Sequence, residues 1–96
     1  MSGPRKRTKP PGPLPGLGEA ATARRHRLGM TQRDMAELAG VGLSSVHALE
    51  SGRDTLTLAL ALKMLNVLGL TLAAGTRRAL EQRPEVRPVE DAGQHQ

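Results

Sequence analysis

The residues with the clearest chemical potential lie close together in LSSVHALE, residues 43–50, which contains two hydroxyls and an imidazole. Ser44, Ser45 and His47 are the residue types of nucleophilic catalysis, in which an acid orients the histidine and the histidine activates the serine. No acid is placed to orient this histidine, and no glycine-rich phosphate loop exists in the chain. We therefore expect neither an enzyme nor a small-molecule substrate.

Metal and redox chemistry find no better support. The chain has no Cys, which excludes disulfides and thiolate ligands. Its three histidines, His26, His47 and His95, are too widely spaced to suggest a metal site. We therefore expect no metal and no cofactor.

Composition favours a polyanionic partner. The net charge is +5, and Phe, Tyr and Trp are all absent, which removes the stacking platforms of single-stranded nucleic-acid binders. Double-stranded DNA is therefore the expected partner. The basic residues between Arg5 and Lys9 are not followed by an apolar run, so we expect no secretory signal and a cytoplasmic protein.

Composition also divides the 96 residues into three parts. Residues 1–18 hold five prolines and four glycines around a basic cluster, which predicts a disordered arm. Residues 76–96 mix both charge signs with two prolines and predict a disordered charged tail. Residues 19–75 remain as the folded domain. A core this small is marginal alone, so we expect a homodimer.

The middle of the chain predicts two short capped helices joined by a tight turn. Thr31 is an N-cap candidate, Asp34 follows three residues later as in a capping box, and Gly40 supplies the stop. The next helix follows a three-residue turn and ends at Gly52, and an earlier helix is expected over residues 19–28. Two capped helices at this separation are a specific arrangement.

A fourth helix is expected where TLTLALAL, residues 55–62, alternates leucine with small residues as a strand would. Leu and Ala favour helices, and helical spacing continues from Leu58 to Gly69. Such a helix is apolar nearly all round and must be covered on more than one side, one of them by a second chain. Residues 70–74 could form a short strand that pairs with the partner chain. The leucines expected at the dimer interface are Leu58, Leu62, Leu65, Leu70 and Leu72.

The apolar window over residues 56–75 is also long enough to cross a bilayer. Lys63 argues against this alternative, because a charge near the middle of a span costs roughly 2.5–3.5 kcal/mol. Asn66 adds a second polar group, and Gly69 interrupts the helix. We therefore expect no membrane partner.

The run RRHRLGMTQRDMAELAGVGLSSVHALESG, residues 24–52, resembles the lambda-repressor-like (Xre-type) helix-turn-helix regulators. The features that carry this likeness are LGMTQ, MAELAGV, the turn of small residues and the ending LESG. The continuation TLTLALALKMLNVLGLTL is similar to the short antitoxin regulators of the HipB-like subgroup. The resemblance covers about residues 20–74 and implies an all-α domain of about four helices, with a C-terminal strand that pairs across the dimer.

The resemblance also implies roles for individual residues. Gln32 matches the glutamine that holds a DNA phosphate at the start of the second helix. Glu50 matches the carboxylate that forms a structural ion pair with an arginine of the first helix, here Arg25. The third helix is expected in the major groove. The residues expected to contact DNA are Gln32, Arg33, Leu43, Ser44, Ser45, His47, Ala48 and Arg53.

The third helix departs from its relatives, which often carry Gln, Arg, Lys or Asn where bidentate base contacts form. Its N-cap is Gly42 instead of Ser or Thr. We therefore expect modest discrimination per base. Alternatives stay open for several residues: His47 contacts DNA or is a solvated helix residue, the arm is an electrostatic aid or enters a minor groove, and Arg24, Arg27 and Arg33 contact DNA or form a solvated basic face.

The function that the resemblance implies is a repressor of its own promoter, acting as the antitoxin of a type II pair with a HipA-like kinase toxin. Such a protein would be cytoplasmic and, when bound to DNA, associated with the bacterial nucleoid. Two alternatives remain: a stand-alone phage or plasmid repressor, and a protein-interaction adaptor whose helix-turn-helix no longer binds DNA.

Overall fold

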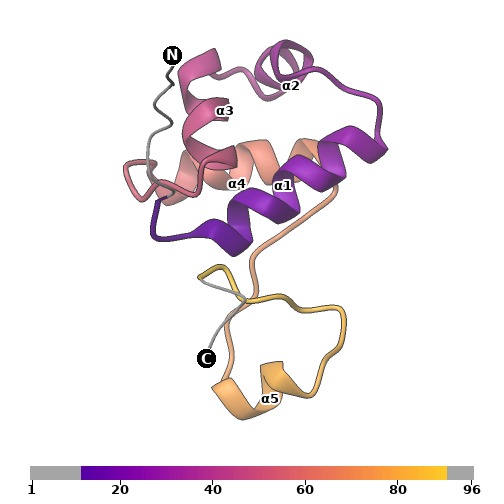
Figure 1. Ribbon diagram of the computed structural model, residues 1–96, viewed down its shortest axis with the longest axis vertical. Helices are drawn as coiled ribbons and strands as arrows, with labels where there is room; N and C mark the ends of the chain where they lie inside the picture. Colours follow the sequence, from indigo (N-terminus) through magenta and orange to yellow (C-terminus); the bar gives the residue numbers. More distant parts are fainter. Residues whose placement is uncertain (1–11, 91–96) are drawn as a thin grey trace, which may run out of the picture.

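The computed structural model describes residues 12–90, which form five helices and no strand (Figure 1). The all-α, lambda-repressor-like fold expected from the sequence is confirmed. The basic cluster of the N-terminal arm, the last residues of the tail and His95 lie outside the described residues. The helices are α1 (Pro15–Arg27), α2 (Gln32–Ala39), α3 (Leu43–Glu50), α4 (Leu58–Val67) and α5 (Arg77–Glu81).

Helices α1 to α4 pack around one small apolar core. With no aromatic side chain available, Met35 and Met64 are fully buried, and their flexible thioether chains suit the irregular gaps between short helices. Each of the four helices contributes to this core. The buried apolar residues are Ala21, Met35, Ala36, Val46, Leu49, Ala61, Met64, Leu65 and Leu68.

The predicted caps of α2 are confirmed. The Asp34 backbone N–H donates to Thr31 Oγ1 at 2.9 Å, and the Thr31 backbone N–H donates to Asp34 Oδ2 at 2.9 Å. The hydrogen bond from the Thr31 backbone to the Asp34 carboxylate, together with one from the Thr31 side chain, lowers the pKa of Asp34. Gly40 ends the helix at φ 69°, a left-handed conformation that glycine adopts without steric cost. Helix α2 is thus bounded at both ends by local signals.

The alternating leucine segment is helical from Leu58 onward, as predicted, and its residues 58–62 form the first half of α4. Thr57 caps it by accepting the Leu60 backbone N–H at 3.1 Å. One face of the helix is exposed, since Leu58 is 63% and Leu62 is 39% accessible. Leu58 and Leu62 therefore form an apolar surface on α4 that the described residues leave exposed.

Three leucines of the expected dimer interface pack against the core of the described chain. Leu65 is 1% exposed and belongs to the core of the single chain, so its side chain is not available to a partner. Leu70 and Leu72 are half-buried against the same core. Because α4 is apolar nearly all round, helical spacing alone does not say which of its faces points inward, and the dimer interface stays a prediction.

The segment after α4 contains no strand within the described chain; residues 70–76 have no regular secondary structure. The predicted strand is one that pairs with a second chain, so it stays a prediction. Among residues 12–90, no helix has the length and apolar character needed to cross a membrane.

Helix α1 begins at Pro15, four residues before the expected Glu19. Proline suits the first helical position, because its missing N–H would have no partner in the helix. The next two N–H groups are satisfied from the far end of the chain. Gly16 donates to the Glu90 carbonyl oxygen at 3.2 Å, and Leu17 donates to that of Val89 at 3.0 Å. Long-range bonds thus extend the helix into a segment whose composition predicts disorder.

Helix α5 stands apart from the four-helix body (Figure 1). Thr76 caps it by accepting the Ala79 backbone N–H at 3.1 Å, and none of its residues is buried. The chain then returns to α1, where Arg87 forms an exposed ion pair with Glu19 at 3.6 Å. The predicted tail therefore includes one short helix and a return strap that ends at the start of α1.

Candidate nucleic-acid interface

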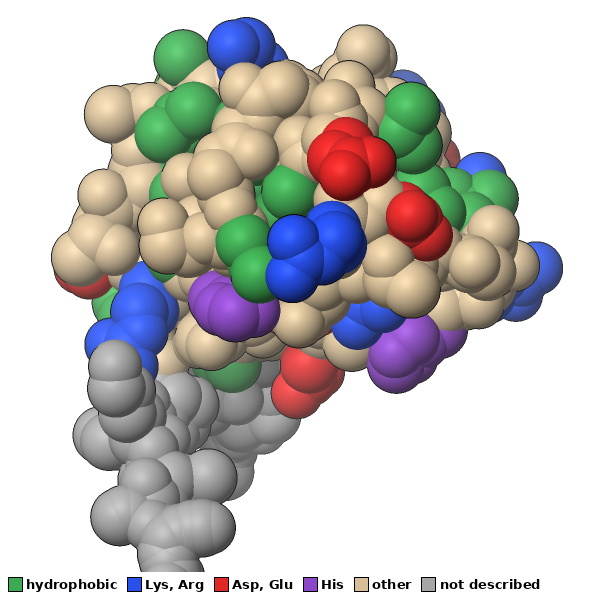
Figure 2. All heavy atoms as spheres, turned by 90° about the horizontal axis from the view of Figure 1, so that it is seen from above, with side chains coloured by type: hydrophobic (Ala, Val, Ile, Leu, Met, Phe, Trp, Pro, Cys, Tyr) green, Lys and Arg blue, Asp and Glu red, His purple; other side chains and the backbone are tan. Residues whose placement is uncertain are grey.

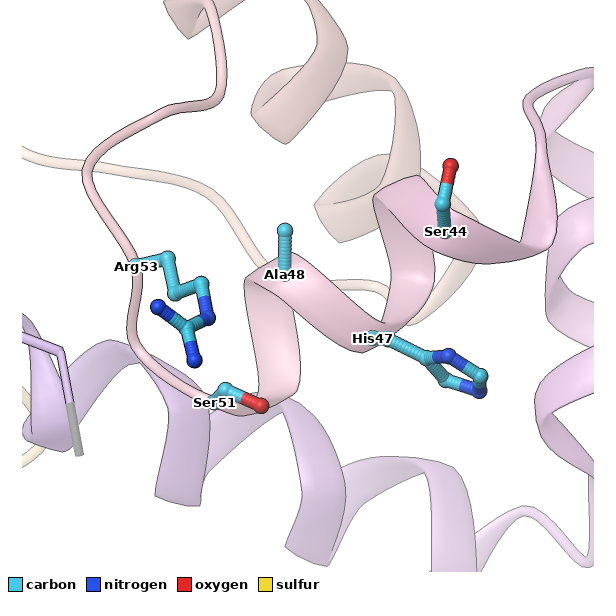
Figure 3. A pocket seen from close by; sticks show the side chains of 5 residues that line it. All are labelled: Ser44, His47, Ala48, Ser51 and Arg53. Atoms are coloured by element: carbon cyan, nitrogen blue, oxygen red, sulfur yellow. The ribbon is translucent and has the colours of Figure 1, made fainter. Parts of the chain in front are cut away.

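The outward face of α3 lines an open hollow on the surface (Figure 3). Ser44, His47, Ala48 and Ser51 follow one another at helical spacing along this face. Arg53 lies in the loop after the helix, and its guanidinium turns back toward the helix end. The hollow has a volume of about 510 Å³ and is lined by short or singly polar side chains. A helix with such a face can approach a ligand closely.

Four of the predicted DNA-contacting residues meet at this hollow, and two on the same helix do not. Leu43 is half-buried and packs against the core, which limits its contact with a thymine methyl. Ser45 is also half-buried. Ser51 also lines the hollow, although it is not among the predicted DNA contacts. Its spacing of seven residues from Ser44 and four from His47 was the signal that could have placed it on the same face.

Gln32 and Arg33 occupy the first turn of α2. Their backbone N–H groups lie at a helix start, where no intrahelical acceptor exists and the dipole favours an anion. The Gln32 side chain is half-buried, and its Nε2 donates to Glu50 Oε1 at 2.9 Å. Its amide is therefore held in place from inside the protein, while Arg33 is exposed.

An ion pair beneath Gln32 ties three helices together. Arg25 Nε lies 2.6 Å from Glu50 Oε2, and Arg25 Nη2 donates to Glu50 Oε1 at 3.1 Å. The two side chains are 10% and 7% exposed. Arg25 Nη1 also donates to the Met30 carbonyl oxygen at 2.9 Å. The pair thus joins α1 to the end of α3 and, through Gln32, to the start of α2.

The Glu50 carboxyl group is ionised more readily than an ordinary glutamate. Burial raises its pKa, but hydrogen bonds from Arg25, Gln32 and Thr22, together with the charge of Arg25, outweigh that effect and hold the pKa below its usual 4.5. Every one of these partners favours the charged form. Glu50 is therefore a structural anion, and nothing in its surroundings prepares it to exchange protons near neutral pH.

Basic side chains are scattered over this end of the molecule. Figure 2, a view onto α2 and α3 from above, shows Lys and Arg side chains separated by acidic, hydrophobic and neutral polar surface. Arg24 has a structural role, since its Nε donates to the Leu68 carbonyl oxygen at 2.8 Å and so holds the end of α4. Arg27 and Arg33 are exposed. The folded face therefore offers shape and single hydrogen bonds more than a concentrated positive charge.

The arrangement suits contact with DNA better than catalysis or metal binding. Within residues 12–90, no three His, Asp or Glu side chains are grouped so that they could hold a metal ion. Ser44, His47 and Ser51 can each make single hydrogen bonds to base edges or phosphates, and Arg53 can pair with a phosphate. Bidentate base contacts of the Arg–guanine or Gln–adenine kind are not available on this helix face.

Comparison with known proteins agrees with this geometry. The family model described as Helix-turn-helix (HTH_3) matches residues 21–74, which contain α2, α3 and α4 in full. A solved structure titled "MDT Protein" is similar, with a TM-score of 0.59 and 25% sequence identity. The similarity covers 76% of this chain and 97% of that chain. No curated protein matches the sequence.

Proposed function

The chain belongs to the helix-turn-helix family of DNA-binding transcription regulators, and on this premise we propose that it is a homodimeric repressor of its own promoter. The observation that carries the proposal is the outward face of α3. Its small polar side chains line an open hollow, while the buried Arg25–Glu50 ion pair holds α3 to α1 on the opposite side of the helix. Helix α3 enters the major groove, and the start of α2 lies on the phosphate backbone.

Contacts with DNA are divided between two helices. The backbone N–H groups at Gln32 and Arg33 bind a phosphate, while Ser44 and His47 contact base edges. Because each base contact is a single hydrogen bond, discrimination at any one position is modest. Specificity then comes from combining two half-sites and from the shape of the DNA between them.

The homodimer is supported by the uncovered face of α4. Leu58 and Leu62 lie next to one another on this helix, and a second copy would remove both from water. Dimers of this class address half-sites about 34 Å apart, so the operator is expected to be nearly palindromic. The double change Leu58→Lys with Leu62→Lys should leave the helical circular dichroism intact and yield monomers by light scattering; an unchanged dimer mass would place the interface elsewhere.

The antitoxin role is the narrower part of the proposal, and it is supported only by the likeness to HipB-like regulators. In that role the cytoplasmic dimer would bind a HipA-like kinase toxin encoded beside it. Co-purification with the product of an adjacent kinase-like gene tests this directly. The stand-alone phage or plasmid repressor would be favoured if no kinase-like gene lies beside this one. It would also be favoured if such a gene is present but its product does not bind.

The decisive experiment is fluorescence anisotropy on duplex DNA from upstream of the gene, compared with a scrambled duplex over a salt series. A repressor binds its own promoter at physiological salt, where binding to the scrambled duplex has faded. Equal and steeply salt-dependent binding to both, or no binding, would contradict the proposal. The adaptor would then be favoured, because α3 lacks the side chains of strong base contacts.

A further inference from the structure

Within the described chain, helix α1 begins without a side-chain cap. Its N-cap residue is Leu14, whose side chain carries no oxygen, whereas Thr31 caps α2 and Thr57 caps α4. An uncapped start leaves backbone N–H groups without partners and weakens a helix. The first turn of α1 therefore needs acceptors from another part of the chain.

Those acceptors come from residues 82–90, here called the strap, which return from α5 to the start of α1 (Figure 1). The backbone N–H of Gly16 donates to the Glu90 carbonyl oxygen at 3.2 Å. The next N–H, that of Leu17, donates to the Val89 carbonyl oxygen at 3.0 Å. The end of the strap thus takes the place of the missing N-terminal cap.

The strap is held to the domain by few other interactions. Val86 and Val89 are half-buried, and the other strap residues are exposed. Arg87 and Glu19 form an ion pair whose side chains are 51% and 67% exposed, and a pair so open to water contributes little. The buried core contains no strap residue. Because weakly held segments open first, the strap can leave α1 without unfolding the core.

The first turn of α1 lies between the strap and the end of α3, with backbone packed against backbone on both sides. A Cβ added to Gly16 would collide with the Pro88 carbonyl oxygen and lie 2.6 Å from that of Glu90. One added to Gly18 would lie 2.5 Å from the Glu50 carbonyl oxygen. These obstacles are main-chain atoms that cannot rotate away. A change in the position of this turn is therefore felt on both sides.

The end of α3 is tied to the same turn and also belongs to the outward face of that helix. Leu14 donates its N–H to the Gly52 carbonyl oxygen at 2.8 Å, and Gly12 donates to that of Ser51 at 3.0 Å. Ser51 and Arg53 line the hollow on the outward face. The start of α1 thus connects the strap to one end of this hollow.

We propose that the strap is a detachable cap of α1 that controls the end of α3. When it is docked, it holds the first turn of α1 against the end of α3. When it leaves, the freed N–H groups of Gly16 and Leu17 have no acceptor, the turn frays, and the residues at the end of α3 lose their support. Release of the strap therefore also weakens DNA binding, and this last step rests on the proposed function.

Amide hydrogen exchange of the unchanged full chain tests whether the strap is docked. Arg33 is the second residue of α2, as Gly16 is of α1, and provides the reference. After correction for the intrinsic rate of each sequence, Gly16 and Leu17 should exchange about tenfold or more slowly than Arg33. Equal rates would mean that the strap does not cap α1 and would overturn the inference.

The released state is produced in the full chain by Arg87→Glu with Val89→Gly. The first change places a like charge opposite Glu19, and the second removes a half-buried side chain. The melting temperature should fall by about 4–8 °C, the shift expected when a small domain loses one helix cap. Arg83→Glu is the matched control, because it makes the same charge change in the strap away from α1 and should leave the melting temperature unchanged.

The connection to α3 is measured in the same two proteins. The amides of Gly52 and Arg53, which donate to the Leu49 and Ala48 carbonyl oxygens, should exchange faster in the released variant than in the Arg83→Glu control. Unchanged exchange at these two amides would show that the strap does not support the end of α3, and would overturn the inference.

Gly16→Ala provides a second variant whose effect changes sign with the state of the strap. Alanine is the better helix former, so the change should raise the melting temperature of the released variant. In the unchanged chain the new Cβ meets the Pro88 and Glu90 carbonyl oxygens, so the melting temperature should fall. A rise in both proteins would overturn the inference. A fall in both would also contradict it, since the obstacle would then lie outside the strap.

Fluorescence anisotropy on the promoter duplex tests the step to DNA. The released variant should bind about fivefold or more weakly than the Arg83→Glu control. Because coupling between two sites is reciprocal, the duplex should also slow exchange at Gly16 and Leu17 in the unchanged chain. Equal affinities would overturn the control of DNA binding by the strap. Failure of the unchanged protein to bind any duplex would overturn the proposed function instead, and the exchange results would still decide whether the strap caps α1.

Discussion

The inner and outer faces of α3 have opposite properties over only eight residues. On the inner face, Val46 and Leu49 are 0% exposed, and Glu50 accepts hydrogen bonds from Arg25 and Gln32. On the outer face, Ser44 and His47 are exposed and carry one polar group each beside the small Ala48. The inner face is specified by packing and charge, whereas the outer face carries only small or singly polar side chains.

This difference separates stability from recognition. Burying a leucine or valine contributes about 1.5–3 kcal/mol to folding, whereas most exposed substitutions change stability by about 0.5 kcal/mol or less. Changes on the inner face should therefore act on DNA binding only through unfolding. Changes on the outer face should alter binding in a protein that is still folded.

The largest expected effect comes from placing a charge on the inner face. Leu49→Lys puts an ammonium group into the core and should destabilise the domain by more than about 4 kcal/mol, enough to abolish the helical circular dichroism signal. Ala48→Lys is the matched control one residue away. It lines the hollow, so the variant should keep the signal and bind all duplexes more tightly. A folded Leu49→Lys protein would mean that the inner face of α3 tolerates a charge.

Arg25→Ala should have the next largest effect, because it leaves the Glu50 carboxylate buried without its cation. The expected loss is about 3 kcal/mol, measured by chemical denaturation at neutral pH. Arg27→Ala is the control, since Arg27 is exposed on the same helix. Equal stability of the two variants would mean that the ion pair does not hold α1 to α3.

The pH dependence of stability should report on the same carboxylate. The pKa of Glu50 is lower in the folded chain than the ordinary 4.5 expected after unfolding. Its contribution to stability is therefore fully present above about pH 4.5 and is lost as the pH falls through the folded-state pKa. Glu50→Gln should cost about 2 kcal/mol at pH 7, and the two proteins should converge in acid. A difference that stays constant with pH would contradict this account.

Local signals in the sequence explain why the bounds of α2 and the start of α4 could be predicted. Thr31 and Asp34 form their capping box within four residues, and the Gly40 turn and the Thr57 cap are equally local. The predicted partners Arg25 and Glu50 lie 2.6 Å apart, although that pairing came from resemblance rather than from spacing.

Features that depend on distant parts of the chain were not predictable in the same way. The start of α1 at Pro15 needs acceptors from Val89 and Glu90, more than seventy residues away in the sequence. The burial of Leu65 needs knowledge of which face of α4 the other helices cover. On the outer face, Ser51 was missed because the end of the helix was treated as a boundary, although its side chain faces the same hollow as Ser44.

The smallest effects are expected from two residues that the proposal places on DNA, His47 on the outer face of α3 and Gln32 at the start of α2. His47→Ala should change the preference between promoter and scrambled duplexes by about 1 kcal/mol, one hydrogen bond, with no change in melting temperature. Gln32→Ala should weaken binding to both duplexes alike and also lower the melting temperature, because Gln32 donates to Glu50 at 2.9 Å. Equal losses on both duplexes from His47→Ala would remove His47 from the base contacts. A Gln32→Ala protein with an unchanged melting temperature but weaker binding would mean that the hydrogen bond to Glu50 does not stabilise the fold and that the Gln32 side chain acts in DNA binding alone.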